Sequence, residues 1–372
     1  MAVVRTDVGT VLQDYGRLAR MAGMEETLSR EIPTLIKLNL SWTKYFPSCS
    51  SQPWQVEGAI RALLDAGYRR ELLLPVENRT VVTEPWKGAR NNRWLPVLSA
   101  LGLPFQPLTE VDWVIYKFKS PLLRLNEIFP DGIEIPKLYP GKQILHLPTV
   151  KTHGHSVTTG AVKNAFGGLL KEVRHYAHKH IHEVLADLVM MQNELHPAVF
   201  TLMDGTVCGD GAGPRTMIPV VKDYILGASD SVAIDAVAAR LMGFDPMKID
   251  YLRLCHERGL GVADPRLIDV AGEPVEGVSF GFKVSRSFVI WGDQLLRKGA
   301  LRSFEKVALH SPLVFWAPIA SNIYHDWLWY PLIGRSRIRA YRKTKWGRLF
   351  DSRYGPGAAG ALTARPSPAS TS

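Results

Sequence analysis

The feature that most constrains the fold is an alternation of short apolar runs with helical patterns over the first 150 residues. Pro33 to Leu40 predicts a buried strand, because the run is short, rich in β-branched residues and leucine, and followed by a polar loop. A helix is expected from Trp54 to Asp65, ending before Gly67. The next strand is expected from Glu71 to Val76. Strands separated by helices of about ten residues indicate βαβ units and a mainly parallel sheet.

Further short apolar runs extend this pattern through the chain. Strands are expected at Trp113 to Tyr116, Gln143 to Leu147, Ala198 to Met203 and Tyr224 to Leu226. One helix is expected from about Thr159 to Glu172, and a histidine-rich helix follows it as far as Met191. We expect an α/β fold, with a mainly parallel sheet or sheets and flanking helices, arranged as two closely packed α/β lobes.

Glycine marks two features of the second half. Residues 206–214 contain too many glycines to predict regular structure, so a loop is expected there. Ser229, Asp230 and Ser231 form a good N-cap for an Ala/Val-rich helix that ends at Gly243. Asp235 lies midway along that apolar helix, where a carboxylate should be paired or face a cleft.

The basic excess of the chain lies near its C-terminus. The formal net charge is +10, and residues 296–353 hold twelve lysines and arginines against three acidic residues, a balance of +9. The rest of the chain is therefore close to neutral. We expect three segments: an α/β core at 1–294, a basic, aromatic and helical extension at 295–354, and a disordered low-complexity tail at 355–372.

Within the extension, residues 313–333 are apolar and aromatic but contain two prolines, Asn322, His325 and Asp326. A membrane-spanning helix needs about 20 predominantly apolar residues, so spanning is not expected. Tryptophans and tyrosines followed by a basic run are typical of an interfacial anchor for an anionic membrane. RNA binding and a folded cap over the core are the alternatives, and the apolar density favours membrane over nucleic acid.

Composition excludes several classes of protein. Cys49, Cys208 and Cys255 are far apart, which argues against a disulfide framework, a zinc finger or an iron–sulfur cluster. The first residues carry charges where a signal peptide needs an apolar core, so a cytoplasmic protein is expected, peripheral on the inner face of the membrane if the extension is an anchor. The GxGxxG and GxxxxGK[ST] fingerprints of nucleotide enzymes are absent.

The candidate functional centre is the stretch from Lys151 to Gly168. Lys151 and His153 are expected just after a strand, where parallel sheets open to their ligands. Lys163 and Asn164 lie on the first turns of a helix, whose free N–H groups and dipole attract carboxylate or phosphate. A desolvated lysine there could act as a base. The alternative is an ordinary solvated lysine near a helix start.

Polar residues also end the other predicted strands, and together they indicate a shared crevice. These residues are Lys37 and Asn39, Glu77 and Asn78, Asp204, and Asp230. Each is ambiguous by itself, since a polar residue at a strand end is usually the start of a loop. Asp204 in particular could orient a lysine, bind a metal or cap a turn.

Four histidines lie within eight residues, at 175, 178, 180 and 182. On a helix His175, His178 and His182 share one face, where a divalent metal could bind. A polar helix surface is the favoured alternative. His175 is the residue of this group nearest to the Lys163 helix, and it is the metal candidate.

The spaced motifs IKLNL, HLPTVKTH, TTGAVKNAFGG, LMDGTVCGDGAGP and GASDSVAIDAVAARLMG resemble domain-of-unknown-function family 362. The resemblance extends from about Ile32 to Gly272. It implies no established activity. Many members of that family carry a ferredoxin-like module with clustered cysteines, which this chain lacks.

A more distant similarity concerns the nickel-pincer lactate racemase family. In that family a histidine is followed by a glycine-rich turn and, ten residues on, by a lysine that tethers the cofactor. His153 and Lys163 fit this spacing. The similarity implies proton or hydride abstraction at a carbon bearing a hydroxyl group, and it makes a nickel cofactor testable although it is not the expected one.

These observations predict an enzyme of uncertain reaction class, racemase-, isomerase- or lyase-like, that acts on a small or amphiphilic anionic substrate. His153, Lys163, Lys151 and Asp204 are the catalytic candidates. Lys37, Asn39, Asn164 and Asp230 are the substrate-binding candidates. The alternative is a non-catalytic module whose basic extension binds a membrane or RNA.

Overall fold

The computed structural model describes residues 1–80, 82–171, 179–285 and 316–357. Ten strands form one mixed sheet, in which the order is β12-β1-β11-β10-β7-β2-β3-β4 and β8 and β9 extend from β10. The strands are β1 (Ala2–Arg5), β2 (Thr34–Lys37), β3 (Leu73–Glu77), β4 (Gln106–Pro107), β7 (Gln143–His146), β8 (Thr149–His153), β9 (Val157–Thr159), β10 (Val199–Ala212), β11 (Thr216–Ala228) and β12 (Ala271–Gly272). The run from β4 to β10 is parallel throughout. The predicted α/β class, with a mainly parallel sheet and flanking helices, is confirmed.

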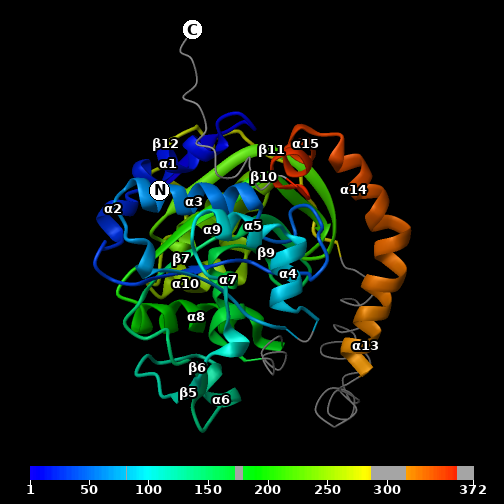
Figure 1. The fold of residues 1–372 in the computed structure, drawn as a ribbon. Coiled ribbons are helices and arrows are strands. Elements are labelled where there is room, and N and C mark those ends of the chain that lie inside the picture. Colours follow the sequence, from blue (N-terminus) through cyan, green and yellow to red (C-terminus); the bar gives the residue numbers. More distant parts are fainter. Residues whose placement is uncertain (81, 172–178, 286–315, 358–372) are drawn as a thin grey trace.

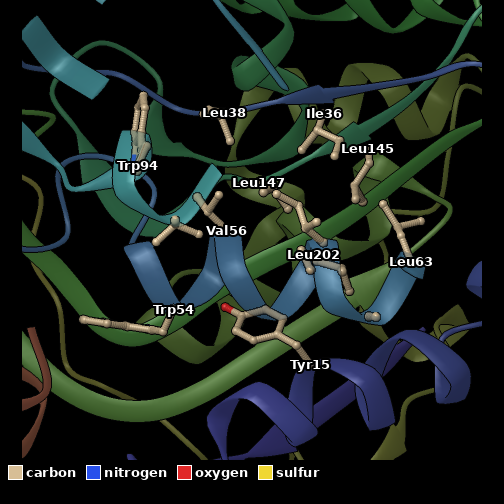
Figure 2. Close-up of a cluster of buried hydrophobic side chains, with 14 of the residues drawn as sticks. Tyr15, Ile36, Leu38, Trp54, Val56, Leu63, Trp94, Leu145, Leu147 and Leu202 are labelled. Atoms are coloured by element: carbon tan, nitrogen blue, oxygen red, sulfur yellow. The ribbon is translucent and has the colours of Figure 1, made fainter. Parts of the chain in front are cut away.

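One face of the sheet is covered by α1 (Val11–Met21), α3 (Pro53–Asp65) and α5 (Trp94–Ala100) (Figure 1). Ile36, Leu145 and Leu202 project from β2, β7 and β10 into this layer (Figure 2). Tyr15 of α1 and Trp54 of α3 close the layer from the helix side. Three shorter helices are α2 (Met24–Thr27), α4 (Pro85–Asn91) and α6 (Leu125–Ile128).

The opposite face is covered by α7 (Ala161–Leu169), α8 (Ile181–Leu195) and α10 (Asp250–Glu257), while α9 (Ser231–Met242) packs nearer β1 and β11. Leu35 and Ile144 belong to this second layer. Because successive residues of a strand point to opposite faces, the apolar runs PTLIKLNL and QILHL supply both layers at once. This two-sided burial accounts for strands without polar alternation.

The glycine-rich residues 206–214, expected to be a loop, instead lie mostly in β10, and this prediction was wrong. β10 and β11 form a long antiparallel hairpin that continues past the edge of the parallel sheet. Its glycines allow close approach: a Cβ on Gly209 would lie 2.3 Å from the Met217 sulfur and 3.0 Å from the Lys151 Cβ. Cross-strand pairing here overrides the local preference for a turn.

Two further expectations need correction. Trp113–Tyr116 is a strand (β5), but it pairs with β6 (Ile133–Pro136) in a separate two-stranded sheet. Lys151 and His153 follow β7 and Pro148 as expected, but they lie within a further strand, β8, which pairs with β10 and β9. The other predicted strands and the helix from Trp54 to Asp65 are present with bounds shifted by a few residues, except that β10 and β11 extend well beyond the expected Ala198–Met203 and Tyr224–Leu226.

The C-terminal extension is helical, as expected. It consists of α13 (Trp316–Asn322), a π-helical segment (Ile323–Gly334), α14 (Arg335–Arg342) and α15 (Lys345–Tyr354), and it follows one side of the core (Figure 1). Among the described residues no helix is long and apolar enough to cross a membrane. Residues 295–315 and the expected disordered tail beyond 357 lie outside the described residues.

Candidate functional site at the carboxyl edge of the sheet

The order of the parallel strands reverses between β2 and β7. The chain moves from β2 outward to β3 and β4, and then returns to place β7 on the other side of β2. In open parallel sheets, ligands bind beyond the carboxyl ends of the strands at such a switch point. The residues that follow β2 and β7 are therefore the first candidates for a functional site.

Lys151 lies at this edge with its ammonium group enclosed by oxygen atoms. Its Nζ donates to Asn39 Oδ1 (2.6 Å), to the Cys49 carbonyl (2.9 Å) and to Thr149 Oγ1 (2.8 Å). The side chain is buried. Burial lowers the pKa of Lys151 to about 7, with a further lowering by the charge of Lys163. A lysine in this condition exchanges its proton near neutral pH.

Asn164 joins the ends of the two strands that flank the switch point. Its Nδ2 lies 3.1 Å from the Lys37 carbonyl at the end of β2 and 3.3 Å from His146 Nδ1 at the end of β7. Its Oδ1 accepts from Asn39 Nδ2 at 3.2 Å. Asn164 is thus fixed by α7 over both strand ends, and Asn39 links it to Lys151.

Lys37 is close to this group but is held as half of a buried ion pair. Its Nζ lies 2.7 Å from Glu77 Oε1 and donates to the Leu38 carbonyl at 2.6 Å. Both side chains are almost fully buried. Gly168 of α7 packs directly on this pair, since a Cβ there would lie 3.0 Å from Lys37 Cε. The pair ties β2 to β3 beneath the site.

Lys163 and His153 approach the site from α7 and β8. Lys163 is half-buried, and its ammonium lies 5.4 Å from the centre of the Phe166 ring, a cation–π contact. His153 is buried, and its Nδ1 accepts from the backbone N–H groups of His155 (3.2 Å) and Ser156 (3.4 Å). These bonds make Nδ1 the acceptor nitrogen, so a neutral His153 carries its proton on Nε2.

The N-terminus of α7 is not open to a ligand in the way the sequence predicted. Asp235 of α9 accepts from the N–H of Ala161 (2.6 Å) and of Val162 (3.2 Å), and from the Tyr251 hydroxyl (3.2 Å). The protein's own carboxylate therefore occupies the dipole end of the helix. This also confirms that Asp235 is paired, as expected for a buried acid.

Two of the predicted site residues lie elsewhere. Asp204 faces the α1–α3 layer, where it accepts from Tyr15 Oη (2.9 Å), Trp54 Nε1 (2.9 Å) and Thr206 Oγ1 (2.8 Å). Asp230 is the N-cap of α9 and accepts from Val232 N (2.7 Å) and Val262 N (2.9 Å). The structure does not bring either carboxylate to Lys151.

The metal candidate His175 lies outside the described residues, as does His178. Over the ranges that are described, no group of three or more His, Cys, Asp or Glu side chains could hold a metal ion. His182 stacks against Tyr251, with 6.3 Å between ring centres. The described residues therefore supply no set of donors for a metal ion.

Several residues of the site were not identified from the sequence. His146 and Thr149 are buried polar partners of Asn164 and Lys151 respectively, and Gln192 supports His146, whose Nε2 lies 2.6 Å from Gln192 Oε1. Burial lowers the pKa of His146 to about 3, so the ring is neutral. A usable signal existed for His146, because an imidazole inside the apolar run QILHL must have a partner.

Comparison with known proteins gives one family and little function. The family model for the domain of unknown function DUF362 matches residues 34–240, so the predicted resemblance to that family is confirmed. The similarity to lactate racemases has no further support and stays a prediction.

Two individual proteins are similar over part of their length. The thylakoid-associated protein sll1697 of Synechocystis sp. (strain ATCC 27184 / PCC 6803 / Kazusa) is 24% identical over 199 residues, 53% of this chain. The chain spans 59% of the length of that relative. A crystal structure of a Thermotoga maritima protein is 12% identical, with a TM-score of 0.35, and the match covers 58% of this chain and 55% of the other.

Proposed function

The chain belongs to the DUF362 family, since the matched residues make up more than half of it, and we propose that it is an enzyme that moves a proton on a small or amphiphilic anionic substrate at the carboxyl edge of β2 and β7. One observation carries the proposal. A buried lysine, Lys151, is held by three oxygen atoms at the switch point of the sheet, next to a second lysine.

Lys151 is the proposed general base. With a pKa of about 7, a large fraction of its side chain is the neutral amine at neutral pH, as an effective base requires. The neutral amine has two N–H donors and one lone pair, so one of its three oxygen partners must release it.

Lys163, Asn39 and Asn164 are the proposed anion-binding residues. The positive charge of Lys163 acts on the site, so a carboxylate or phosphate bound at Lys163 would have a cationic partner beside the Lys151 base. Asn39 and Lys163 are half-buried rather than enclosed, which gives a ligand a route to the edge. His153, two residues from Lys151 on the same side of β8, is the proposed second acid or base.

Proton exchange in deuterated buffer tests this function without a known substrate. A panel of 2-hydroxy acids, amino acids and phosphate monoesters is incubated with the full chain in D₂O, and loss of each C–H signal is followed by ¹H NMR. We expect exchange with at least one anionic compound, and loss of exchange of about a hundredfold or more in Lys151→Met, the order expected for removal of a general base. Lys163→Met should act mainly on KM.

The matched control is Lys248→Met, because Lys248 is 85% exposed and pairs only loosely with Asp245. It should leave exchange unchanged. If the whole panel shows no exchange, or if Lys151→Met keeps the wild-type rate, then Lys151 is not a base and the non-catalytic interpretation stands.

A second proposal concerns attachment to a membrane surface, and it rests on side chains left exposed by the extension. Its large apolar residues recur every four or five positions and face solvent, while Trp329 and His325 face the core. The exposed set, here called the apolar stripe, is Ile319, Ile323, Trp327, Leu328, Leu332 and Ile333. Exposed arginines follow it at positions 335, 339 and 342. Aliphatic and tryptophan side chains beside a basic segment suit an anionic bilayer.

Vesicle flotation tests the attachment. The full chain should float with vesicles that contain anionic lipid and should bind more weakly to zwitterionic ones. Replacing Trp327, Leu328 and Leu332 together by serine should weaken binding at least roughly tenfold, since each buried side chain contributes about 1.5–3 kcal/mol. The control replaces Ile115 and Leu267, which are as exposed but lie outside the extension.

The cyanobacterial relative is a thylakoid-associated protein, which agrees with this proposal. We propose that the protein is cytoplasmic and binds peripherally to the inner face of the membrane. If the serine variant floats as well as the wild type, the stripe is not the contact. If instead the full chain binds RNA and not vesicles, the basic residues serve nucleic acid.

A further inference from the structure

The loop between β2 and α3 lies between Lys151 and the C-terminal extension. It comprises residues 38–52 and is here called the β2–α3 loop. Asn39 and Ser51 close its two ends, because the Ser51 N–H donates to the Asn39 carbonyl and the Asn39 N–H donates to Ser51 Oγ. One side of the loop faces β8: the Cys49 carbonyl and Asn39 accept from Lys151, and the Ser48 carbonyl accepts from Thr149 Oγ1. The loop therefore supplies two of the three oxygens around the Lys151 amine.

The other side of the same loop is held by the extension. Trp42 Nε1 donates to Asp326 Oδ1 at 2.6 Å, and Lys44 Nζ donates to the Asp326 carbonyl at 2.9 Å. The Tyr330 hydroxyl donates to the Tyr45 carbonyl at 3.0 Å. Every polar contact named here joins the loop tip, residues 42–45, to the π-helical segment.

Apolar packing reinforces these contacts. Trp42 and Phe46 form one cluster with Trp329, and Cys49 belongs to the same cluster. The ring of Trp42 lies 6.0 Å from that of Trp329 and 5.1 Å from that of Tyr330. Cys49 thus packs in this cluster and also offers its carbonyl to Lys151, so one residue links the cluster to the amine.

We propose that the C-terminal extension is a positioning element for the Lys151 site, and that Asp326 and Trp42 are the residues through which it acts. The extension holds the β2–α3 loop closed over the amine and keeps water away from it. If the contact between Trp42 and Asp326 is lost, the loop opens more often and Lys151 becomes accessible to solvent and reagents. The proposal concerns the exposure of one amine and does not depend on the reaction proposed above.

Lysine-specific reductive methylation of the full chain, read by peptide mass spectrometry, tests the proposal. The reactivity of Lys151 is expressed relative to that of the exposed Lys248 in the same sample. Wild-type Lys151 should react slowly. Asp326→Ala should raise the relative reactivity about tenfold, which corresponds to ~1.4 kcal/mol of loop-opening free energy. Trp42→Phe keeps most of the ring packing but removes the donor, and should act in the same direction.

The double variant provides a sharper criterion. If both residues act through one hydrogen bond, Asp326→Ala with Trp42→Phe should not exceed the larger single effect. Arg353→Gln is the control, because it breaks a different contact of the extension, the one between α15 and Glu57 at 2.6 Å, which involves no residue of the loop.

Two results would overturn the proposal. One is unchanged Lys151 reactivity in both Asp326→Ala and Trp42→Phe while circular dichroism shows that the proteins are folded. The other is an equal rise in Arg353→Gln, which would mean that any loosening of the extension exposes the core. Because Trp42→Phe is conservative and Asp326 is partly exposed, a folding failure of one variant leaves the other as the test.

Discussion

The carboxylate of Asp235 on α9 accepts a 2.6 Å hydrogen bond from the backbone N–H of Ala161, the first residue of α7. The two residues are 74 positions apart, and their contact fixes the start of the helix that carries Lys163 and Asn164. Gly160 makes room for it, because a Cβ at that position would lie 2.0 Å from Asp235 Oδ1. The helix that borders the site is thus capped by another helix.

Loss of this cap should be costly. Asp235→Ala leaves two buried backbone N–H groups and the Tyr251 hydroxyl without their acceptor, and we expect a loss of about 2–4 kcal/mol in the free energy of unfolding. Urea denaturation at neutral pH measures it. Asp245→Ala removes a similar cap at an exposed position and should cost less than ~1 kcal/mol. Equal losses would show that the Asp235 contacts add nothing to an ordinary cap.

The same residue should give the stability a pH dependence. Burial raises the pKa of Asp235 to about 7, against 3.8 for the free side chain. Between these values the folded state holds a proton that the unfolded state has released, so its stability falls as pH rises from 4 to 7. The free energy of unfolding of wild type minus that of Asp235→Asn should therefore decrease over this range, by up to about 1.4 kcal/mol per pH unit. A difference that is flat or rises with pH contradicts the raised pKa.

Two tryptophans of the extension should differ strongly in their contribution to the free energy of unfolding. Trp346 is fully buried, 5.0 Å from the ring of Trp54, and its Nε1 donates to Asp223 at 2.6 Å. Trp346→Ala should cost about 3–5 kcal/mol, as large truncations in a packed core do. Trp327 is 77% exposed, and Trp327→Ala should change the stability by less than ~0.5 kcal/mol. Thermal and urea unfolding compare the two, and similar values would mean that the extension does not stabilise the core.

The ion pair beneath the site should be sensitive to loss of one partner. Glu77→Gln leaves the ammonium of Lys37 buried without its counter-charge, and we expect a loss of about 3–5 kcal/mol. Asp112→Asn breaks the surface pair with Lys137 at 4.0 Å and should cost no more than ~1 kcal/mol. Added salt should weaken only the surface pair. Urea denaturation with and without about 0.5 M salt, which is enough to screen exposed charges, distinguishes the buried pair from the surface pair.

The sequence predicted the parallel part of the sheet well, because β2, β3 and β7 are short buried runs with helices between them. It failed at the β10–β11 hairpin, where glycines serve close contact between strands rather than a turn. Antiparallel pairing with β11 makes that segment regular, and the contact of Gly209 with Lys151 of β8 adds a distant partner. No local pattern contains this information.

The sequence predicted only part of the candidate site. Lys151, Asn39 and Asn164 come together because each lies at the carboxyl edge of the sheet or on the helix above it. Asp204 does not, and its direction could have been inferred: Phe200 and Leu202 point to the α1–α3 layer, so the alternate residue 204 points there too. The role of the β2–α3 loop depends on contacts with residues almost 300 positions away, which spacing does not reveal.

The position of α15 has a consequence for the synthesis of the protein. Trp54 and Glu57 are covered by Trp346, Arg353 and Tyr354, which leave the ribosome almost 300 residues later. The backbone groups of β1 that pair with β11 likewise have no partner until β11 is synthesised. Until those residues emerge, a nascent chain therefore presents an indole, a carboxylate and an open strand edge to the surrounding solution. Chaperones that bind such surfaces have their longest opportunity on this protein before residue 346 emerges.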